Sequence, residues 1–146
     1  MDAALIDNWN SVVKPNDIVY HLGDVAFGDY YPAVSRLNGE KHLVLGNHDD
    51  VKRNDYRQLF KTVSPYLERK INGIRVIMFH FRIWSWNHSN HGSVHCYGHH
   101  HGNLLTVGGE LYNLDGQPVK LEERLLIPKG RSQEISVDTN NYFPYN

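Results

Sequence analysis

Four short apolar segments of the chain each end in side chains that can bind a metal ion. The segments and the polar residues that follow them are 17–22 before Asp24, 41–45 before Asn47, His48 and Asp49, 74–79 before His80, and 93–97 before His99 and His101. In layered α/β proteins, ligands bind beyond the carboxyl ends of the strands. The pattern therefore predicts four strands whose ends meet at one site, which constrains the fold more than any other feature of the sequence.

Helices are predicted between the strands of the first half of the chain. Residues 2–13 carry apolar side chains at nearly helical spacing, and 31–37 and 51–60 also have a helical pattern. Strands and helices that alternate in this way are typical of α/β domains with parallel strands.

The second half of the chain is predicted to be mostly strand. The Asn-Gly pair at 72–73 joins segments 66–71 and 74–79 as a hairpin. Residues 103–130 are predicted only as an excursion that contains a hairpin, and 133–138 as the last strand. The whole pattern indicates one mixed α/β layered domain, with both parallel and antiparallel strand pairs.

Composition limits the partners that we expect. The 15 Lys and Arg residues nearly balance the 16 Asp and Glu residues and form no basic block, so nothing predicts tight binding to nucleic acid or to an anionic membrane. No apolar run approaches about 18 residues, and the single cysteine cannot form an internal disulfide, so we expect a soluble cytoplasmic protein. The ten histidines, seven of them between residues 80 and 101, need an explanation, because histidine is the commonest metal ligand.

The motifs appear in an order that resembles a known family of enzymes. They are GD at 23–24, GNHD at 46–49, a histidine at 80 and GHHH at 98–101. This order is similar to that of the calcineurin-like metallophosphoesterases, in particular their small single-domain bacterial, archaeal and phage members, over residues 1 to about 140. The resemblance implies a layered sandwich of two mixed β-sheets flanked by helices, with two divalent metal ions at one edge.

The resemblance also implies a role for each motif residue. Asp24 would bridge both metal ions, Asn47, His80 and His99 would complete the second ion, and His101 would bind the first. His48 would be the catalytic histidine, and Asp49 would hold it by a hydrogen bond. Mixed nitrogen and oxygen ligands suit Mn, Fe, Zn or Ni better than Ca. The expected activity is hydrolysis of a phosphodiester or phosphomonoester of a small, nucleotide-like substrate by a metal-bound hydroxide.

One motif of that family does not occur in this sequence. The family begins with a strand that ends in D-x-H and supplies two ligands of the first metal ion, and no D-x-H precedes the GD motif here. The domain is therefore expected to lack its first core strand, and three explanations stay open: a truncated chain, a natural variant with one metal ion, or completion by another chain. The open sheet edge favours a homo-oligomer. Activity of this chain is expected to be weak or absent, and the alternative function is a non-catalytic metal-binding scaffold that acts through protein partners.

The remaining histidines and tryptophans allow two interpretations each. Side chains alternate along an extended segment, so His99 and His101 are expected on one side and His100 on the other. His95 is interpreted either as an outer support of the metal ligands or as a core residue, and His88 and His91 as parts of a polar loop. Trp84 and Trp86 either stack on a substrate or cover the core.

Overall fold

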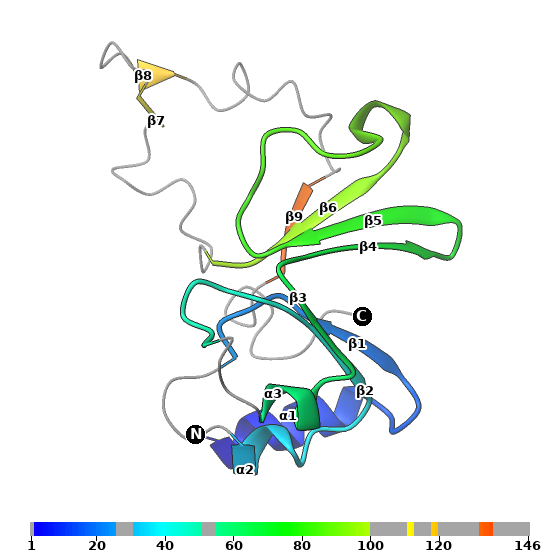
Figure 1. The fold of residues 1–146 in the computed structure, drawn as a ribbon, viewed down its shortest axis with the longest axis vertical. Helices are drawn as coiled ribbons and strands as arrows, with labels where there is room; N and C mark the ends of the chain where they lie inside the picture. The colour runs from blue at the N-terminus through cyan, green and yellow to red at the C-terminus, as the bar shows by residue number, and fades with distance from the viewer. Residues whose placement is uncertain are drawn as a thin grey trace.

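The protein is described by a computed structural model that covers residues 2–25, 31–50, 55–99, 111–112, 118–119 and 132–135 (Figure 1). The described elements are α1 (Asp2–Val12), β1 (Ile18–His21), α2 (Tyr31–Val34), β2 (Glu40–Val44), α3 (Tyr56–Leu59), β3 (Thr62–Ser64), β4 (Tyr66–Ile71), β5 (Ile74–Phe79), the 3-10 helix η1 (Ser89–His91), β6 (Val94–Tyr97), β7 (Leu111–Tyr112), β8 (Pro118–Val119) and β9 (Ser132–Glu134). The structure is a mixed α/β fold, as the sequence predicts.

Two sheets form the body of the structure. The first has the order β1-β2-β3 with parallel pairs, and the second has the order β4-β5-β6-β9, with one antiparallel pair followed by two parallel ones. The three helices lie beside the first sheet, and the second sheet lies on its other side (Figure 1). The carboxyl ends of β1, β2, β5 and β6 therefore reach the same region of the molecule.

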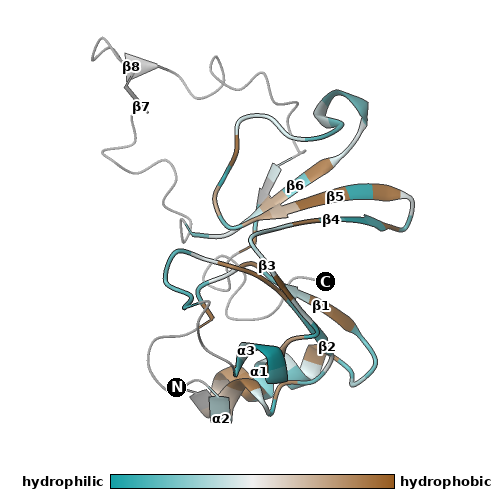
Figure 2. Cartoon of the chain, viewed as in Figure 1, coloured by the Kyte–Doolittle hydropathy of each residue, from teal (hydrophilic) through white to brown (hydrophobic). Residues whose placement is uncertain are grey.

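Strand β2 shows how the core is divided between the layers. Leu43 and Val44 are adjacent and both fully buried, and their side chains belong to different clusters. Leu43 packs with residues of α2 and α3, whereas Val44 packs with Leu67 and Met78 of the second sheet. Because successive side chains of a strand point to opposite faces, the end of β2 is covered on both sides, which accounts for the consecutive apolar residues at 43–45. In Figure 2 the hydrophobic colour is concentrated on the strands, while α3 is mostly hydrophilic.

The β4–β5 hairpin has the bounds that its sequence predicts. Asn72 and Gly73 both have positive φ, of 48° and 84°, which is the conformation of the tight turns that match the twist of a hairpin. Asparagine and glycine adopt this conformation at little cost, so the pair fixes the register of the two strands. Ile71 lies opposite Ile74.

Several predicted elements differ in extent. The first helix is confirmed, whereas α2 and α3 are four-residue helices, shorter than the predicted 31–37 and 51–60, and residues 51–54 lie outside the described part. Strand β3 was not predicted, because a strand of three residues is too short for alternating apolar and polar side chains to be recognised in the sequence. Strands β7 and β8 form an antiparallel pair within the predicted excursion.

Strand β1 is an edge strand within the described residues. Its described ladder runs to β2 alone, and Ile18 at its start is 59% exposed. Among the described helices, none has the length and apolar character needed to cross a lipid bilayer.

Candidate metal centre

Three of the predicted ligands meet at the carboxyl ends of the strands. One ligand atom from each of Asp24, His80 and His99 lies within 4.8 Å of the other two. Asp24 follows β1 of the first sheet, while His80 and His99 follow β5 and β6 of the second. The cluster therefore joins the two sheets, and its members lie up to 75 residues apart in the sequence.

His80 is the buried centre of this cluster. It is 1% exposed, and its Nδ1 lies 2.6 Å from the carbonyl oxygen of Leu22, to which it donates a hydrogen bond. A backbone acceptor on one ring nitrogen fixes the tautomer, so the lone pair of Nε2 points into the site. Nε2 lies 3.3 Å from Oδ2 of Asp24 and 3.0 Å from Oδ1 of Asn47.

This arrangement of acceptors is suited to hold a cation. With Nδ1 of His80 donating to the Leu22 carbonyl, the Nε2 lone pair faces the Asp24 carboxylate at 3.3 Å and the Asn47 amide oxygen at 3.0 Å. The donor set, with two imidazoles, a carboxylate and an amide oxygen, is one that divalent transition metals bind in proteins.

Glycines allow the ligand loops to approach each other. A Cβ on Gly23 would lie 2.6 Å from Cα of Gly46 and 2.6 Å from Nδ1 of His80, and a Cβ on Gly46 would overlap the Asp24 carboxylate. Gly98 donates its N–H to the carbonyl oxygen of His80 at 2.9 Å. The glycines before Asp24 and Asn47 thus remove the side chains that would separate the loops, a role that the sequence interpretation did not assign.

Two of the ligands have an unusual backbone conformation. Asp24 and His99 have φ of 53° and 72°, in the left-handed region that side chains disfavour. Each such residue costs about 1–3 kcal/mol, and such residues cluster where the surroundings hold a functional group in place. The contacts of Asp49 provide this restraint for Asp24.

Asp49 connects the two loops of the first sheet. Its carboxylate accepts hydrogen bonds from the backbone N–H of Asp24, Val25 and Gly46 at 2.8–2.9 Å, and from the hydroxyl of Tyr56 at 3.0 Å. Partial burial by itself raises the pKa of Asp49, but these hydrogen bonds outweigh it and hold the pKa below its ordinary value. The hydrogen bond from Asp49 to the His48 side chain stays a prediction.

His48 lies at the surface beside the cluster. The residue is exposed, and its backbone N–H donates to Oδ1 of Asp24 at 2.9 Å, which leaves Oδ2 directed toward His80. His101, the predicted ligand of a first metal ion, lies outside the described residues.

His21 is a buried neighbour of the cluster to which the sequence interpretation gave no role. Its Nδ1 is buried and has no hydrogen-bond partner among the described residues. Burial lowers the pKa of His21, against the opposing effect of the Asp49 and Asp24 carboxylates. It packs edge-on against Phe60 of the helix-side core.

The structure decides the interpretation of His95 and of Trp86. His95 is fully buried, donates from Nδ1 to the carbonyl of Ile77, and accepts the N–H of Ile83 at Nε2. Both nitrogens therefore bond to backbone, and His95 is a core residue. Trp86 is buried as well, whereas Trp84 is 58% exposed.

An aromatic side chain borders the cluster. The ring of Phe81 meets that of His99 edge-on, with centroids 4.6 Å apart, and the residue is 37% exposed. Phe81 also contacts the ring of His80, with centroids 5.0 Å apart. An apolar surface therefore lies beside two of the candidate ligands.

The chain belongs to the family of the uncharacterized protein MJ1445 of Methanocaldococcus jannaschii, with 31% identity over 149 residues that cover 99% of this chain and 69% of that protein. It is also similar to the Gene 66 protein of Mycobacterium phage L5, with 41% identity over 54 residues, 33% of this chain and 26% of that protein. No protein-family model matches the sequence.

A solved structure shares the fold. The crystal structure of AQ665, a protein of unknown function from Aquifex aeolicus, superimposes with a TM-score of 0.63 and covers 98% of this chain and 79% of that one. The sequence identity is 23%, so this similarity concerns the fold alone.

Proposed function

We propose that the chain is a metallophosphoesterase, a hydrolase with the two-sheet sandwich of the calcineurin-like family that acts on phosphate ester bonds of a small phosphorylated substrate. The observation that carries the proposal is the meeting of Asp24, His80 and His99 within 4.8 Å, with the Asn47 amide oxygen 3.0 Å from His80. The order of these residues along the chain and their origin from four strand ends support the same assignment.

The residues present fit a divalent cation. Asp24, Asn47, His80 and His99 would hold it, with the Nδ1–H of His80 fixed on the Leu22 carbonyl. Such an ion polarises a phosphoryl oxygen and lowers the pKa of bound water. Mn, Fe, Zn and Ni suit this mixed set of nitrogen and oxygen ligands.

The chain's own residues would bind and orient the substrate and move the proton. His48, exposed beside the cluster, can neutralise or protonate the leaving oxygen. Asp49 keeps the loops of Asp24 and Asn47 at a fixed separation through its backbone hydrogen bonds. Phe81 offers an apolar surface to the rest of the substrate.

The test combines metal content with turnover. The purified chain is loaded with Mn²⁺, its metal content is measured by elemental analysis, and hydrolysis of bis-p-nitrophenyl phosphate is followed. We expect bound metal and turnover in the wild type, metal without turnover in His48→Ala, and neither in His80→Ala. Asp24→Asn removes the carboxylate of the cluster. Its matched control is Asp7→Asn, since Asp7 is exposed on α1.

Two outcomes would contradict the proposal. If metal binds but no ester is hydrolysed, even at high enzyme concentration, the metal-binding scaffold becomes the better interpretation. If no metal binds and the resonances of His80 show a protonated Nε2, a proton and not a cation joins the acceptors.

A further inference from the structure

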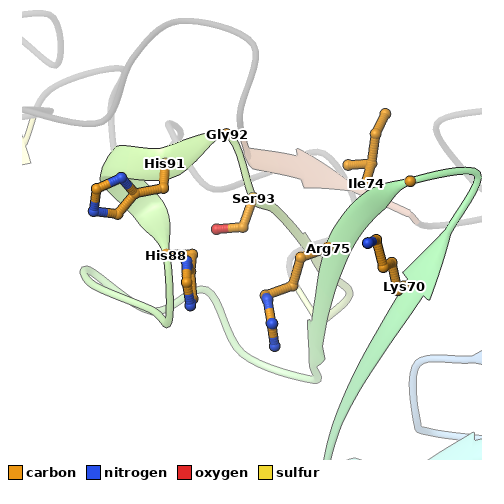
Figure 3. Close-up of a pocket in the computed structure, with 8 residues that line it drawn as sticks. Lys70, Ile74, Arg75, His88, His91, Gly92 and Ser93 are labelled. Atoms are coloured by element: carbon orange, nitrogen blue, oxygen red, sulfur yellow. The ribbon is translucent and has the colours of Figure 1, made fainter.

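A second polar site lies at the opposite end of β5 from the candidate metal centre. A pocket of about 270 Å³ is formed there by the tip of the β4–β5 hairpin and the η1 loop (Figure 3). Arg75 belongs to its lining, and His80 follows five residues later along the chain. At about 3.3 Å per residue the two sites are separated by about 17 Å along the strand.

Two cations of the hairpin line this pocket. Lys70 lies directly opposite Arg75 in the antiparallel ladder, and both line the pocket. Residues directly opposite in such a pair have Cβ atoms about 5 Å apart on the same face of the sheet, and like charges there destabilise it. The hairpin therefore carries a repulsion that an anion between the two side chains would remove.

The nearest carboxylate does not neutralise the pair. Glu68 pairs with Arg75 at 2.9 Å, but its carboxylate also accepts the hydroxyl of Tyr66 at 2.6 Å and the amide of Asn87 at 3.1 Å. Lys70 has no ion-pair partner in the part of the chain that the structure describes. Among the residues that the structure describes, none of those lining the pocket is Asp or Glu.

Two imidazoles complete the lining from the η1 loop. The rings of His88 and His91 lie with their centroids 5.7 Å apart, and both residues are exposed. Each ring can donate an N–H to an anion. Figure 3 shows the Arg75 side chain directed toward His88, with His91 on the same loop as His88 and Lys70 on the neighbouring strand.

The η1 loop is held in place by buried contacts. Ser93 is 1% exposed, accepts a hydrogen bond from the indole N–H of Trp86 at 2.9 Å, and donates to the carbonyl of Asn87 at 2.8 Å. Asn87 in turn donates to Glu68 of β4. The two histidines therefore project from a loop that is anchored to both the core and the hairpin.

We propose that this pocket binds a phosphate-class dianion through Lys70, Arg75, His88 and His91. Charge-assisted hydrogen bonds from a guanidinium, an ammonium and imidazoles are the groups that proteins use for phosphate. A divalent cation fits less well, because Lys70 and Arg75 would repel it at this distance. The dianion is inorganic phosphate or the terminal phosphate of a monoester, and the site does not depend on the metal centre.

The test follows the histidine resonances of the intact chain by NMR without added metal. Inorganic phosphate and, separately, ribose 5-phosphate are titrated at constant pH and ionic strength. We expect saturable shifts of the His88 and His91 resonances, with a dissociation constant in the millimolar range or tighter. Equal binding of both anions would show that the site recognises the phosphate dianion itself. Tighter binding of ribose 5-phosphate would show that the site prefers phosphate monoesters.

Variants separate this pocket from general charge effects. Lys70→Gln and His91→Gln are each expected to weaken phosphate binding by about tenfold or more. Lys14→Gln, which removes one exposed positive charge elsewhere, should leave binding unchanged. His80→Asn should also leave it unchanged, which keeps this test separate from that of the metal centre.

Three results would overturn the proposal. The first is the absence of saturable shifts with either anion. The second is an equal response to chloride at matched ionic strength, which would indicate screening alone. The third is binding of Zn²⁺ or Ni²⁺ by His88 and His91 that exceeds the response to phosphate, which would make the pair a metal site.

Discussion

The two ends of β5 have opposite chemistry. At its carboxyl end the groups around His80 are acceptors: the Asp24 carboxylate, the Asn47 amide oxygen and an imidazole lone pair. At its amino end the pocket lining offers donors from Lys70, Arg75, His88 and His91, and Arg75 also pairs with the Glu68 carboxylate. The strand thus separates a group of acceptors suited to a cation from a group of donors suited to an anion.

The largest expected effect concerns the acceptor end. Asp24→Asn and His80→Ala each alter a candidate ligand. Loss of a hydrogen bond that only orients a metal ligand lowers metal affinity by about 10–100-fold, and we expect a larger decrease for these two variants. Turnover should fall with metal content. Elemental analysis after dialysis and the diester assay measure both. Retention of metal by either variant would show that the cluster does not hold the ion.

Gly23→Ala should disrupt the approach of the loops at the same end. Gly23 has φ of 93°, and an added Cβ would collide with Gly46 and His80. Overpacking and left-handed strain together should cost about 3 kcal/mol or more in the free energy of unfolding. Urea unfolding measures this loss. Gly73→Ala is the control, because Gly73 has a similar φ of 84° but open space where the Cβ would lie. An equal loss of stability in Gly73→Ala would show that backbone strain alone causes the effect of Gly23→Ala.

Asp49→Asn should loosen the acceptor end without touching a ligand. The amide keeps the shape but loses the charge, and its N–H₂ faces backbone N–H donors. The expected cost is about 2–4 kcal/mol, against about 1 kcal/mol for Tyr56→Phe, which removes one of the four hydrogen bonds. Equal stability of wild type and Asp49→Asn in urea would contradict this role.

Stability should fall in mildly acidic solution because of the buried histidines. Burial lowers the pKa of His95 in the folded chain, so the unfolded chain takes up the proton first as the pH falls. The contribution of neutral His95 to the free energy of unfolding is complete above the ordinary histidine pKa of about 6.5. Below that pH it decreases by at most about 1.4 kcal/mol per pH unit. Asp49, whose folded pKa is lowered, adds a second loss only below about pH 4. Urea unfolding from about pH 8 to about pH 5 should show the first loss, and a flat profile would exclude it.

The smallest expected effect belongs to the donor end. Lys70→Thr removes the like charge opposite Arg75 and should raise the free energy of unfolding by a few tenths to about 1 kcal/mol at low salt. Added salt should reduce the gain, because screening weakens the repulsion in the wild type. Added phosphate should stabilise the wild type and not the variant. A gain that is independent of salt would point to strand propensity instead.

The sequence predicted the elements whose signals are local. The Asn72-Gly73 turn and the strands on either side of it were predicted to the residue, because turn chemistry and apolar runs mark them directly. Convergence of Asp24, His80 and His99 followed from the position of each at a strand end. Strand β3 was missed because it is short and its pairing with β2 is a long-range contact.

Other features depend on contacts that no local pattern reveals. Two of the four partners of Asp49 are the backbone N–H groups of Asp24 and Val25, in a loop about 25 residues away, so the sequence could not indicate them. The donor pocket depends on the register that places Lys70 opposite Arg75, and on the fold of the η1 loop beside the hairpin. A hairpin register counted outward from the turn would have revealed the cation pair, whereas the approach of His88 and His91 required the structure.

The hydrogen bonds of Asp49 affect how the centre can adjust to ions of different radius. Asp24 and Asn47 lie on loops that this carboxylate ties into one unit on the first sheet. His80 and His99 follow paired strands of the second sheet, with Gly98 bonded to His80. The four candidate ligands therefore form two stiff halves, one on each sheet. If the centre holds an ion as proposed, the separation of the two halves is set by the packing of Val44 against Leu67 and Met78, so this packing would influence which ionic radius fits.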